Sequence, residues 1–305
     1  MSGTASLESL RELIMRAVPE PAFRTFAEVF ERCQPNWPLH QFLAAFTATA
    51  RTLGREPLDL AGSGISAVSV ALAPTGAHTT DPARGLDRLP INGITSDVAG
   101  RALLLHALAN AAPQKLEEAV AAAYDDGDAL EKLAVVRSLS LLPQAERFTR
   151  IALDAGRNNE LDLVHALACH NPFPAQHYDE LAWNKLYMKA AFLALPLQDI
   201  MGLEQRANAE LSRMALHYVE QQESAVRAFP GELWLAIAHF PPPGAAAKLL
   251  GYASHATAEQ RLGAAIALEH LQQPRTAVFL SERLPVETDE RVRTVLARTL
   301  AALAH

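Results

Sequence analysis

Three side chains that could do chemistry lie within six residues of one another, in the segment His165-Ala-Leu-Ala-Cys169-His170. A cysteine thiolate can act as a nucleophile or bind a metal, and a nearby histidine can serve as its base or as a second ligand. If the segment is helical, the four-residue spacing places His165 and Cys169 on one face. These two residues are therefore candidate ligands of a transition metal, and all three side chains are candidate catalytic residues.

The alternative interpretation of these residues is structural. Zinc needs three or four ligands, and local geometry supplies only His165 and Cys169. Free cysteine is among the most buried residue types, so Cys169 can equally be a buried thiol beside a half-buried histidine. The sequence contains no Gly-x-Ser-x-Gly elbow, His-Glu-x-x-His zinc helix, Rossmann fingerprint or Walker loop. We therefore predict no metal, no cofactor and no catalytic residue, with these three side chains as the alternative.

A second group of polar residues recurs in mostly apolar, helical territory and could recognise a ligand or a partner. Arginine binds carboxylates and phosphates through paired hydrogen bonds, so Arg157 and Arg213 would meet an anionic group. Asparagine amides would fix the orientation of the bound molecule. Helix capping explains many of these residues as well as binding does. The residues predicted to line the working surface are Arg157, Asn158, Asn171, Asn184, Lys189 and Arg213.

The acidic run Asp125-Asp126-Gly127-Asp128 suggests calcium binding at first sight. The alternating oxygen ligands and the distal glutamate of an EF-hand loop are absent, however. Asp128 and Glu131 instead have the spacing of a capping box, in which two side chains satisfy free amide groups at a helix start. We therefore predict that a helix begins here.

Helices must position most of these residues. Apolar side chains recur at three- and four-residue spacing through most of the chain, whereas alternating strand patterns are nearly absent. Prolines fall mostly between the periodic stretches, where they end one helix or begin the next. The exception is 54–95, which is rich in turn sequences and is predicted to be a long loop, either a functional lid or an insertion. Within it, 65–72 is the only run that could form a short strand, although a helix is equally possible.

Internal repetition indicates how the helices are arranged. Four basic residues are each followed by leucine at the seventh position and by leucine or alanine at the tenth, namely Arg101, Lys132, Arg261 and Arg293. Arg101 and Lys132 are 31 residues apart, and Arg261 and Arg293 are 32 residues apart, which is about the length of one helical hairpin. Between 132 and 261 the period is blurred, so the pattern indicates stacked hairpins rather than one named regular repeat. We predict an all-α stack of antiparallel hairpins, a right-handed HEAT- or TPR-like α-solenoid. Amphipathic helices of similar length can also share such offsets by chance.

The predicted organisation is a single continuous domain with four parts. These are N-terminal helices over 1–53, the long loop over 54–95, a helical core over 96–240, and C-terminal HEAT-like hairpins over 241–305. Half of the 305 residues are hydrophobic, which is enough for a well-buried core.

Charge and cysteine content limit the partners and the compartment. A net charge of −7 argues against general binding of nucleic acid or of anionic membranes. No window of 18 apolar residues is free of charge, so we expect no membrane span. Two cysteines cannot build a disulfide framework, and the start has no secretion signal. We therefore expect a cytoplasmic protein.

Several short stretches occur in a characteristic order and spacing. They are Arg101-Ala-Leu-Leu-Leu105, Gly127-Asp128, Leu139-Ser-Leu-Leu-Pro143, Asp154-Ala-Gly-Arg-Asn-Asn159, Ala168-Cys-His-Asn-Pro-Phe-Pro-Ala175, Asn184, Lys189-Ala-Ala-Phe192, Glu210-Leu-Ser-Arg-Met214 and Tyr218. In these stretches, from about 96 to 240, the chain resembles the EboA family of metabolite-traffic proteins. The family typically has an acidic residue where this chain has His170, and a family tryptophan is replaced near Ile94-Thr95.

The resemblance implies a cytosolic component of a small operon whose other products look like a prenyltransferase, sugar-phosphate-type enzymes and hydrolases. That machinery is linked to moving or completing a secondary metabolite bound for the cell envelope, and it supplies no known reaction for this component. The prediction is a non-enzymatic adaptor or carrier whose partners are proteins of the same operon and a small anionic or prenylated metabolite. The alternative is a cryptic enzyme or small-molecule-binding protein acting on a prenylated or sugar-derived intermediate.

Overall fold

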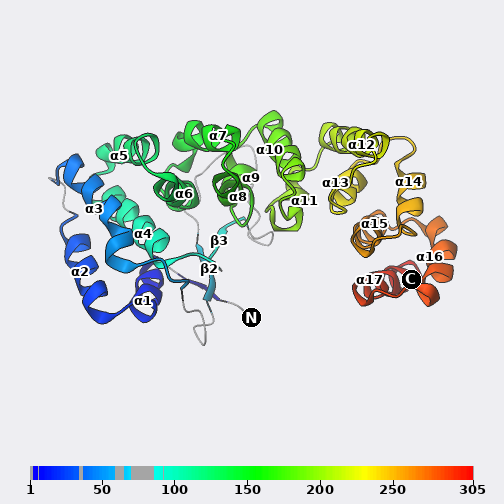
Figure 1. The fold of residues 1–305 in the computed structure, drawn as a ribbon, viewed down its shortest axis with the longest axis horizontal. Coiled ribbons are helices and arrows are strands. Elements are labelled where there is room, and N and C mark those ends of the chain that lie inside the picture. The colour runs from blue at the N-terminus through cyan, green and yellow to red at the C-terminus, as the bar shows by residue number, and fades with distance from the viewer. Residues whose placement is uncertain are drawn as a thin grey trace. The chain divides into compact units, whose positions relative to one another are not determined.

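The computed structural model describes residues 3–5, 7–33, 37–58, 65–69, 86–91 and 93–304. Seventeen α-helices account for most of these residues, which confirms the all-α prediction (Figure 1). Contacts divide the chain into two compact units, Met1–Asp179 and Glu180–His305. The finer division into four parts and the solenoid arrangement remain predictions.

The described residues of the first unit form nine α-helices and a small sheet, joined by turns and short connections. Its α-helices are α1 (Leu7–Ala17), α2 (Glu20–Glu31), α3 (Leu39–Leu53), α4 (Ser96–Ala111), α5 (Pro113–Asp125), α6 (Ala129–Ser138), α7 (Thr149–Arg157), α8 (Leu161–Ala168) and α9 (Phe173–His177). Two 3₁₀ turns, Leu139–Leu141 and Ala145–Phe148, connect α6 to α7. Helix α4 packs against α3, α5 and α6, and α6 packs in turn against α8.

Helix α4 is the centre of this unit. Its first ten residues, from Ser96 to Leu105, are all buried, which requires its polar side chains to be paired. Asp97 Oδ2 accepts a hydrogen bond from Arg101 Nη1 at 2.8 Å, one turn further along the helix. Arg101 Nε donates to the carbonyl oxygen of Phe46 on α3. Arg101, the first of the repeated basic residues, therefore links α4 to α3 inside the core.

The predicted long loop supplies two strands of a three-stranded sheet, and the third comes from the start of the chain. Strand β2 (Ile65–Ser69) pairs in parallel with β1 (Gly3–Ala5) and antiparallel with β3 (Arg88–Pro90). The run 65–72, for which strand and helix were equally possible, is a strand over its first five residues. It is not the only strand of the predicted loop, because β3 lies there too. An isolated bridge joins Pro57 to Thr95. The rest of the predicted loop, at 59–64, 70–85 and 92, lies outside the described residues.

The predicted capping box is confirmed at the start of α6. The Asp128 side chain accepts from the backbone N–H of Glu131 at 2.8 Å, and the Glu131 side chain accepts from the backbone N–H of Asp128 at 2.9 Å. Gly127 is required in front of it, because a Cβ there would lie 2.2 Å from the carbonyl oxygen of Ala123. The acidic run thus ends one helix and begins the next.

The second unit contains eight α-helices among its described residues. They are α10 (Glu180–Phe192), α11 (Leu203–Arg206), α12 (Ala209–Ser224), α13 (Leu233–His239), α14 (Ala245–Tyr252), α15 (Ala258–Leu271), α16 (Ala277–Arg283) and α17 (Glu290–Leu303). Helix α13 packs against α12 and α15, and α15 packs against α17. Gly263 lets the backbone of α15 lie against the backbone at Gly231, since a Cβ at Gly263 would lie 2.0 Å from the carbonyl oxygen of Gly231.

Buried charge also ties the second unit together. Arg261, another of the repeated basic residues, forms two hydrogen bonds to Glu287 at 2.9 and 2.8 Å. Arg283 donates to the same carboxylate at 2.8 Å. The Glu287 side chain is fully buried, so this carboxylate draws α15 and α16 toward the turn before α17.

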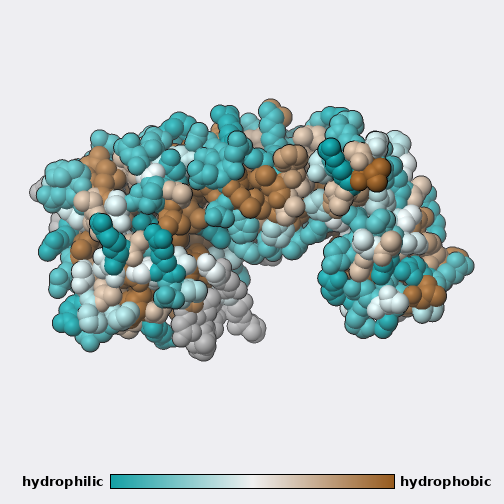
Figure 2. Space-filling model, in the orientation of Figure 1, coloured by the Kyte–Doolittle hydropathy of each residue, from teal (hydrophilic) through white to brown (hydrophobic). Residues whose placement is uncertain are grey.

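The surface is largely hydrophilic on the face drawn in Figure 2, with separate apolar patches between the charged side chains. Large apolar side chains exposed by more than half include Leu181 and Phe192, both on α10. Eleven residues make three helical turns, so these two side chains share one face of that helix.

Candidate functional site

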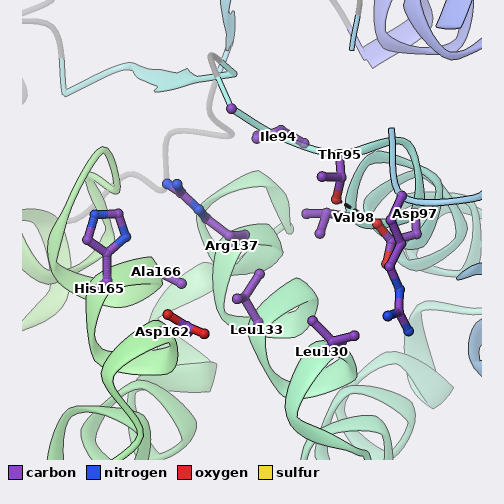
Figure 3. Close-up of a pocket in the computed structure, with 12 residues that line it drawn as sticks. Ile94, Thr95, Asp97, Val98, Leu130, Leu133, Arg137, Asp162, His165 and Ala166 are labelled. Carbon is purple, nitrogen blue, oxygen red and sulfur yellow. Dashed lines mark hydrogen bonds between the residues drawn. The ribbon is translucent and has the colours of Figure 1, made fainter. Parts of the chain in front are cut away.

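A cavity of about 290 Å³ in the first unit is the best-formed candidate site. It lies where the start of α4 meets α6 and α8, and Figure 3 shows its lining side chains around a common space. The lining residues are Arg55, Gly93, Ile94, Thr95, Asp97, Val98, Leu130, Leu133, Arg137, Asp162, His165 and Ala166. A volume near 300 Å³ is at the lower end of small-molecule sites, and suits a small ligand or the head of a larger one.

Helical periodicity explains why these residues line one space. Leu130, Leu133 and Arg137 are three and seven positions apart on α6, so they lie on one face. Asp162, His165 and Ala166 on α8 are three and four positions apart and share a face in the same way. The third side comes from 93–98, where the chain enters α4.

Arg137 is the main cationic group of the cavity. It is 9% exposed, and Nη1 donates to the carbonyl oxygens of Cys169 and His170, at 3.1 Å each. Burial lowers the pKa of Arg137 below its usual value. No carboxylate in the described part of the chain forms an ion pair with it. The guanidinium is therefore held in place by neutral carbonyl groups, and Arg137 is one of the residues that line the cavity.

The buried carboxylate of Asp97, which also lines the cavity, is already neutralised by an ion pair. Asp97 is 2% exposed, accepts from Thr95 Oγ1 at 2.6 Å, and forms the ion pair with Arg101. Figure 3 marks the bond between Thr95 and Asp97. Arg55 and Asp162 are exposed where the cavity meets solvent. The interior thus has an excess of positive charge next to apolar side chains of α4 and α6.

The structure separates the three residues of the candidate catalytic segment. His165 is half-buried and lines the cavity. Helix α8 ends at Ala168, and Cys169 is its C-cap, whose backbone N–H donates to the carbonyl oxygen of His165. Cys169 is fully buried and is not among the described residues lining the cavity, and His170 follows in a left-handed conformation with φ 53°. Only His165 is therefore placed to meet a molecule in the cavity.

Asn171 is a buried residue that joins two of the helices lining the cavity. It is 1% exposed, its Nδ2 donates to the carbonyl oxygens of Val136 and Ala166, and its Oδ1 accepts from the backbone N–H of Phe173. These bonds tie α6 to α8, the two helices that present lining side chains. Asn171 therefore fixes the geometry of the site from inside the protein.

The end of α7 holds the other two predicted binding residues of this unit. Arg157 is the last residue of α7 and is exposed. The side chain of Asn158 accepts from the backbone N–H of Glu160 at 2.8 Å, which shapes the turn into α8. Gly156 does not cap this helix, because it lies inside α7 and the C-cap is Asn158. Neither Arg157 nor Asn158 is among the described residues that line the cavity.

The remaining predicted binding residues lie in the second unit. Asn184 is buried and exchanges two amide hydrogen bonds with Asn208, the N-cap of α12, at 3.1 and 2.9 Å. Arg213 is exposed and pairs with Glu210 at 2.6 Å, one turn earlier on α12. Lys189 is half-buried on α10, and burial lowers its pKa. Asn184 thus joins α10 to α12, whereas Arg213 and Lys189 lie nearer the surface.

Sequence reasoning missed Arg137, the residue that most defines the cavity. Its signal is a lone cation in the apolar run Ala134-Val-Val-Arg137-Ser-Leu139. A charged side chain in such a run must be paired or face a cavity, because burial of an isolated charge is costly. Asp97 and Arg101 are a second such signal, four residues apart in an otherwise apolar stretch.

The comparisons with known proteins gave one match. A family model described as "Metabolite traffic protein EboA" matches residues 6–238, which contain every residue lining the cavity. The match begins at residue 6, whereas the short stretches on which the resemblance rests lie between about 96 and 240. Neither a curated protein nor a solved structure matches the chain. Among the described residues, no helix has the length and apolar character needed to cross a membrane.

Proposed function

Since this chain belongs to the EboA family, we propose that it is a non-enzymatic carrier or adaptor in the traffic of a secondary metabolite. In this proposal it works in the cytoplasm with the other products of its operon. The cavity around Arg137 takes the anionic group of the metabolite. The single observation that carries the proposal is a buried guanidinium, held by two carbonyl oxygens, in the wall of a cavity of about 290 Å³.

The charge of Arg137 supports an anionic ligand. Burial of a charge without an opposite charge is costly, and a phosphate or carboxylate in the cavity would offset that cost. Charge-assisted hydrogen bonds to such a group contribute roughly 1.5–3 kcal/mol each. At the mouth the charges of Arg55 and Asp162 are of opposite sign, so the attraction for an anion rests on Arg137.

The apolar lining supports a ligand with a hydrocarbon part. Ile94 and Val98 lie on one side of the cavity and Leu133 on another, close to Arg137 in sequence and in space (Figure 3). This pairing of a buried cation with apolar side chains suits a prenylated phosphate better than a free sugar phosphate, whose hydroxyl groups would lack partners. A carrier of this kind would shield the apolar part of its cargo from water.

The adaptor role draws support from α10. Leu181 is 59% exposed and Phe192 is 71% exposed on one face of this helix, and Lys189 lies one turn from Phe192. Large apolar side chains exposed on one face of a helix are a feature of protein-binding surfaces. The proposed partner is another product of the same operon, which would receive or deliver the metabolite.

The enzymatic alternative has one observation in its favour. His165 lines the cavity and could act as a general acid or base toward a bound prenylated or sugar-derived intermediate. Incubation of the chain with the metabolite separates the two functions. A carrier returns the metabolite unchanged, whereas an enzyme converts it at a rate that falls in His165→Gln.

The binding test uses geranyl diphosphate as the probe and isothermal titration calorimetry as the readout. Arg137→Gln removes the charge while the amide can still donate to a carbonyl oxygen, so the turn after α8 is retained. We expect its dissociation constant to rise by about 10- to 100-fold, as loss of one charge-assisted hydrogen bond implies. The matched control is Arg150→Gln, which removes an exposed arginine paired with Asp125. Equal affinities in the three proteins would contradict the proposed site.

A further inference from the structure

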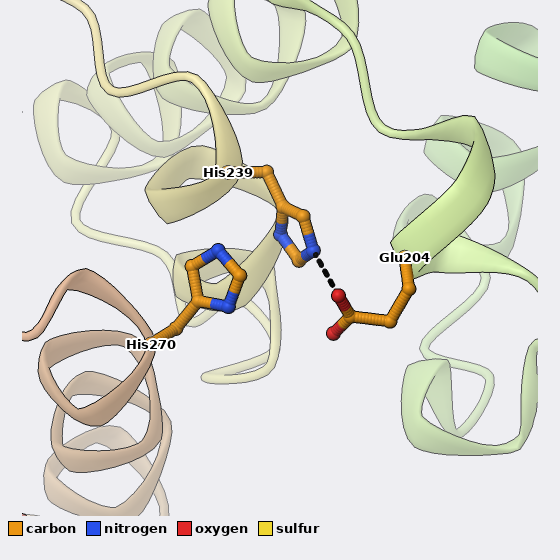
Figure 4. Close-up of side chains that lie close together, drawn as sticks. All are labelled: Glu204, His239 and His270. Atoms are coloured by element: carbon orange, nitrogen blue, oxygen red, sulfur yellow. Dashed lines mark ion pairs between the residues drawn. The ribbon is translucent and has the colours of Figure 1, made fainter.

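Three potential metal ligands converge in the second unit, at Glu204, His239 and His270. Each offers one ligand atom, and these atoms all lie within 4.8 Å of one another. Figure 4 shows the two imidazole rings and the carboxylate turned toward a common point. Glu204 comes from α11, whereas His239 ends α13 and His270 lies in the last turn of α15. The C-terminal ends of α13 and α15 carry partial negative charge, which favours a cation there.

The protonation of His239 can be assigned from its neighbours. Nδ1 lies 2.8 Å from the carbonyl oxygen of Leu235, and a carbonyl only accepts, so Nδ1 must carry a proton. Nε2 then faces Glu204 Oε2 at 3.2 Å. The His239 side chain is 6% exposed, and among the described residues Nε2 has no hydrogen-bond partner. The lone pair of a buried nitrogen and those of a carboxylate oxygen repel each other at this distance. A cation, either a proton or a metal ion, would remove that repulsion.

His270 completes the cluster from the other side. Its ring lies against that of His239, with centroids 4.0 Å apart and an interplanar angle of 29°. Burial and the neighbouring His239 lower the pKa of His270. A neutral imidazole has a lone pair for a metal, whereas an imidazolium has none.

The distances fit a tetrahedral ion. Zinc bonds of about 2.0–2.1 Å place neighbouring ligand atoms roughly 3.3 Å apart. The 3.2 Å between His239 Nε2 and Glu204 Oε2 already matches that spacing. His270 and Glu204 are both exposed enough to close the remaining distance by side-chain rotation. The bond from His239 to the Leu235 carbonyl is the outer hydrogen bond that usually orients a metal-binding histidine.

We propose that Glu204, His239 and His270 bind a divalent transition metal, with zinc as the preferred ion. Two imidazoles and one carboxylate leave a fourth coordination position open to solvent on the side of Glu204. That position would be filled by water, or by an oxygen of a bound molecule. The ion would also link α11, α13 and α15, and so hold the short helix α11 in place.

The competing occupant of this cluster is a proton. Protonated His239 would form an ordinary ion pair with Glu204 and leave His270 as a stacked neighbour. The two cases differ in the role of His270, which a metal requires as a ligand and a proton does not. Substitution of His270 therefore separates them.

The experiment is a zinc titration of the full chain after treatment with a chelator, with the metal-sensitive dye 4-(2-pyridylazo)resorcinol as competitor. We expect one zinc ion per chain, and an affinity at least about 100-fold lower in His270→Ala and in Glu204→Gln. Both side chains are exposed, so circular dichroism should show that the variants remain folded. The matched control is His217→Ala, which removes an exposed histidine from α12.

Cobalt supplies an independent readout, because four-coordinate Co²⁺ absorbs strongly in the visible range. The wild-type chain and His217→Ala should give that spectrum, and His270→Ala should not. Failure of the wild-type chain to bind either ion would overturn the proposal, and so would equal affinities in wild type and His270→Ala.

Discussion

Arg137 Nη1 donates a hydrogen bond to the carbonyl oxygen of His170 across 3.1 Å, which links the α6 side of the cavity to the turn after α8. His170 has a positive φ of 53°, an uncommon conformation for a residue other than glycine. That turn also directs the Cys169 carbonyl at the same guanidinium nitrogen. The local backbone thus positions the charge that we assign to ligand binding.

The buried pair of Asp97 and Arg101 should be essential for stability. Replacement of Asp97 by alanine leaves the guanidinium buried without a counter-charge, and we expect the free energy of unfolding to fall by about 3–5 kcal/mol. The control is Asp125→Ala, which breaks an exposed pair and should cost less than about 1 kcal/mol. Urea unfolding followed by circular dichroism measures both. A loss for Asp97→Ala no larger than for the control would contradict the structural role of this pair.

The Glu287 cluster should make stability depend on pH. Burial alone would raise the pKa of Glu287, but hydrogen bonds from Arg261 and the Asp289 backbone, with the charges of Arg261 and Arg283, lower it to about 2 from the usual 4.5. A depressed folded-state pKa stabilises the fold above pH 4.5, and this contribution is lost as the pH falls from 4.5 toward 2. Acid should therefore weaken the second unit.

The variant Glu287→Gln tests this dependence. At pH 7 it should lower the free energy of unfolding by roughly 2 kcal/mol, less than the pKa difference alone implies because solvent partly screens the arginines. The gap between wild type and variant should narrow as the pH falls below 4.5. Urea unfolding at pH 7, 5 and 3 measures it, and a gap that stays constant with pH would count against the assignment.

Both cysteines should be chemically inert in the folded chain. Cys33 and Cys169 are free and buried, and burial raises the pKa of Cys33 to about 11. The thiolate is the reactive form, so we expect reaction with 5,5′-dithiobis(2-nitrobenzoic acid) at least about 100-fold slower than in guanidinium chloride. Rapid reaction of Cys169 in the native chain would contradict this prediction and support a role for this thiol as a nucleophile. Full export of the metabolite by Cys169→Ser in a deletion strain would exclude it.

Local patterns in the sequence were enough to predict the helices. Apolar periodicity and proline positions depend on neighbours within a few residues, and so does the capping box of Asp128 and Glu131. For 65–72 the local pattern left strand and helix equally possible, and the strand forms over Ile65–Ser69. Its pairing partners, β1 and β3, are distant in sequence and were not predicted.

The cavity itself was not predictable from local patterns. It forms where 93–98, α6 and α8 meet, and the bonds that hold Arg137 span more than thirty residues. Asparagine is equally suited to a binding site and to a buried hydrogen-bond network. The sequence could not reveal that Asn171 and Asn184 bond inside the fold, and their role in binding remains a prediction. Likewise, nothing local indicated that α8 ends one residue before Cys169.

The most direct test of the account is native mass spectrometry of the tagged chain recovered gently from its own host, beside Arg137→Gln prepared in the same way. We predict that the wild-type chain retains an anionic molecule of a few hundred daltons and that Arg137→Gln has lost it. Recovery of the same molecule in equal amount from both proteins, or of no molecule from either, would contradict the assignment of this cavity as the metabolite site.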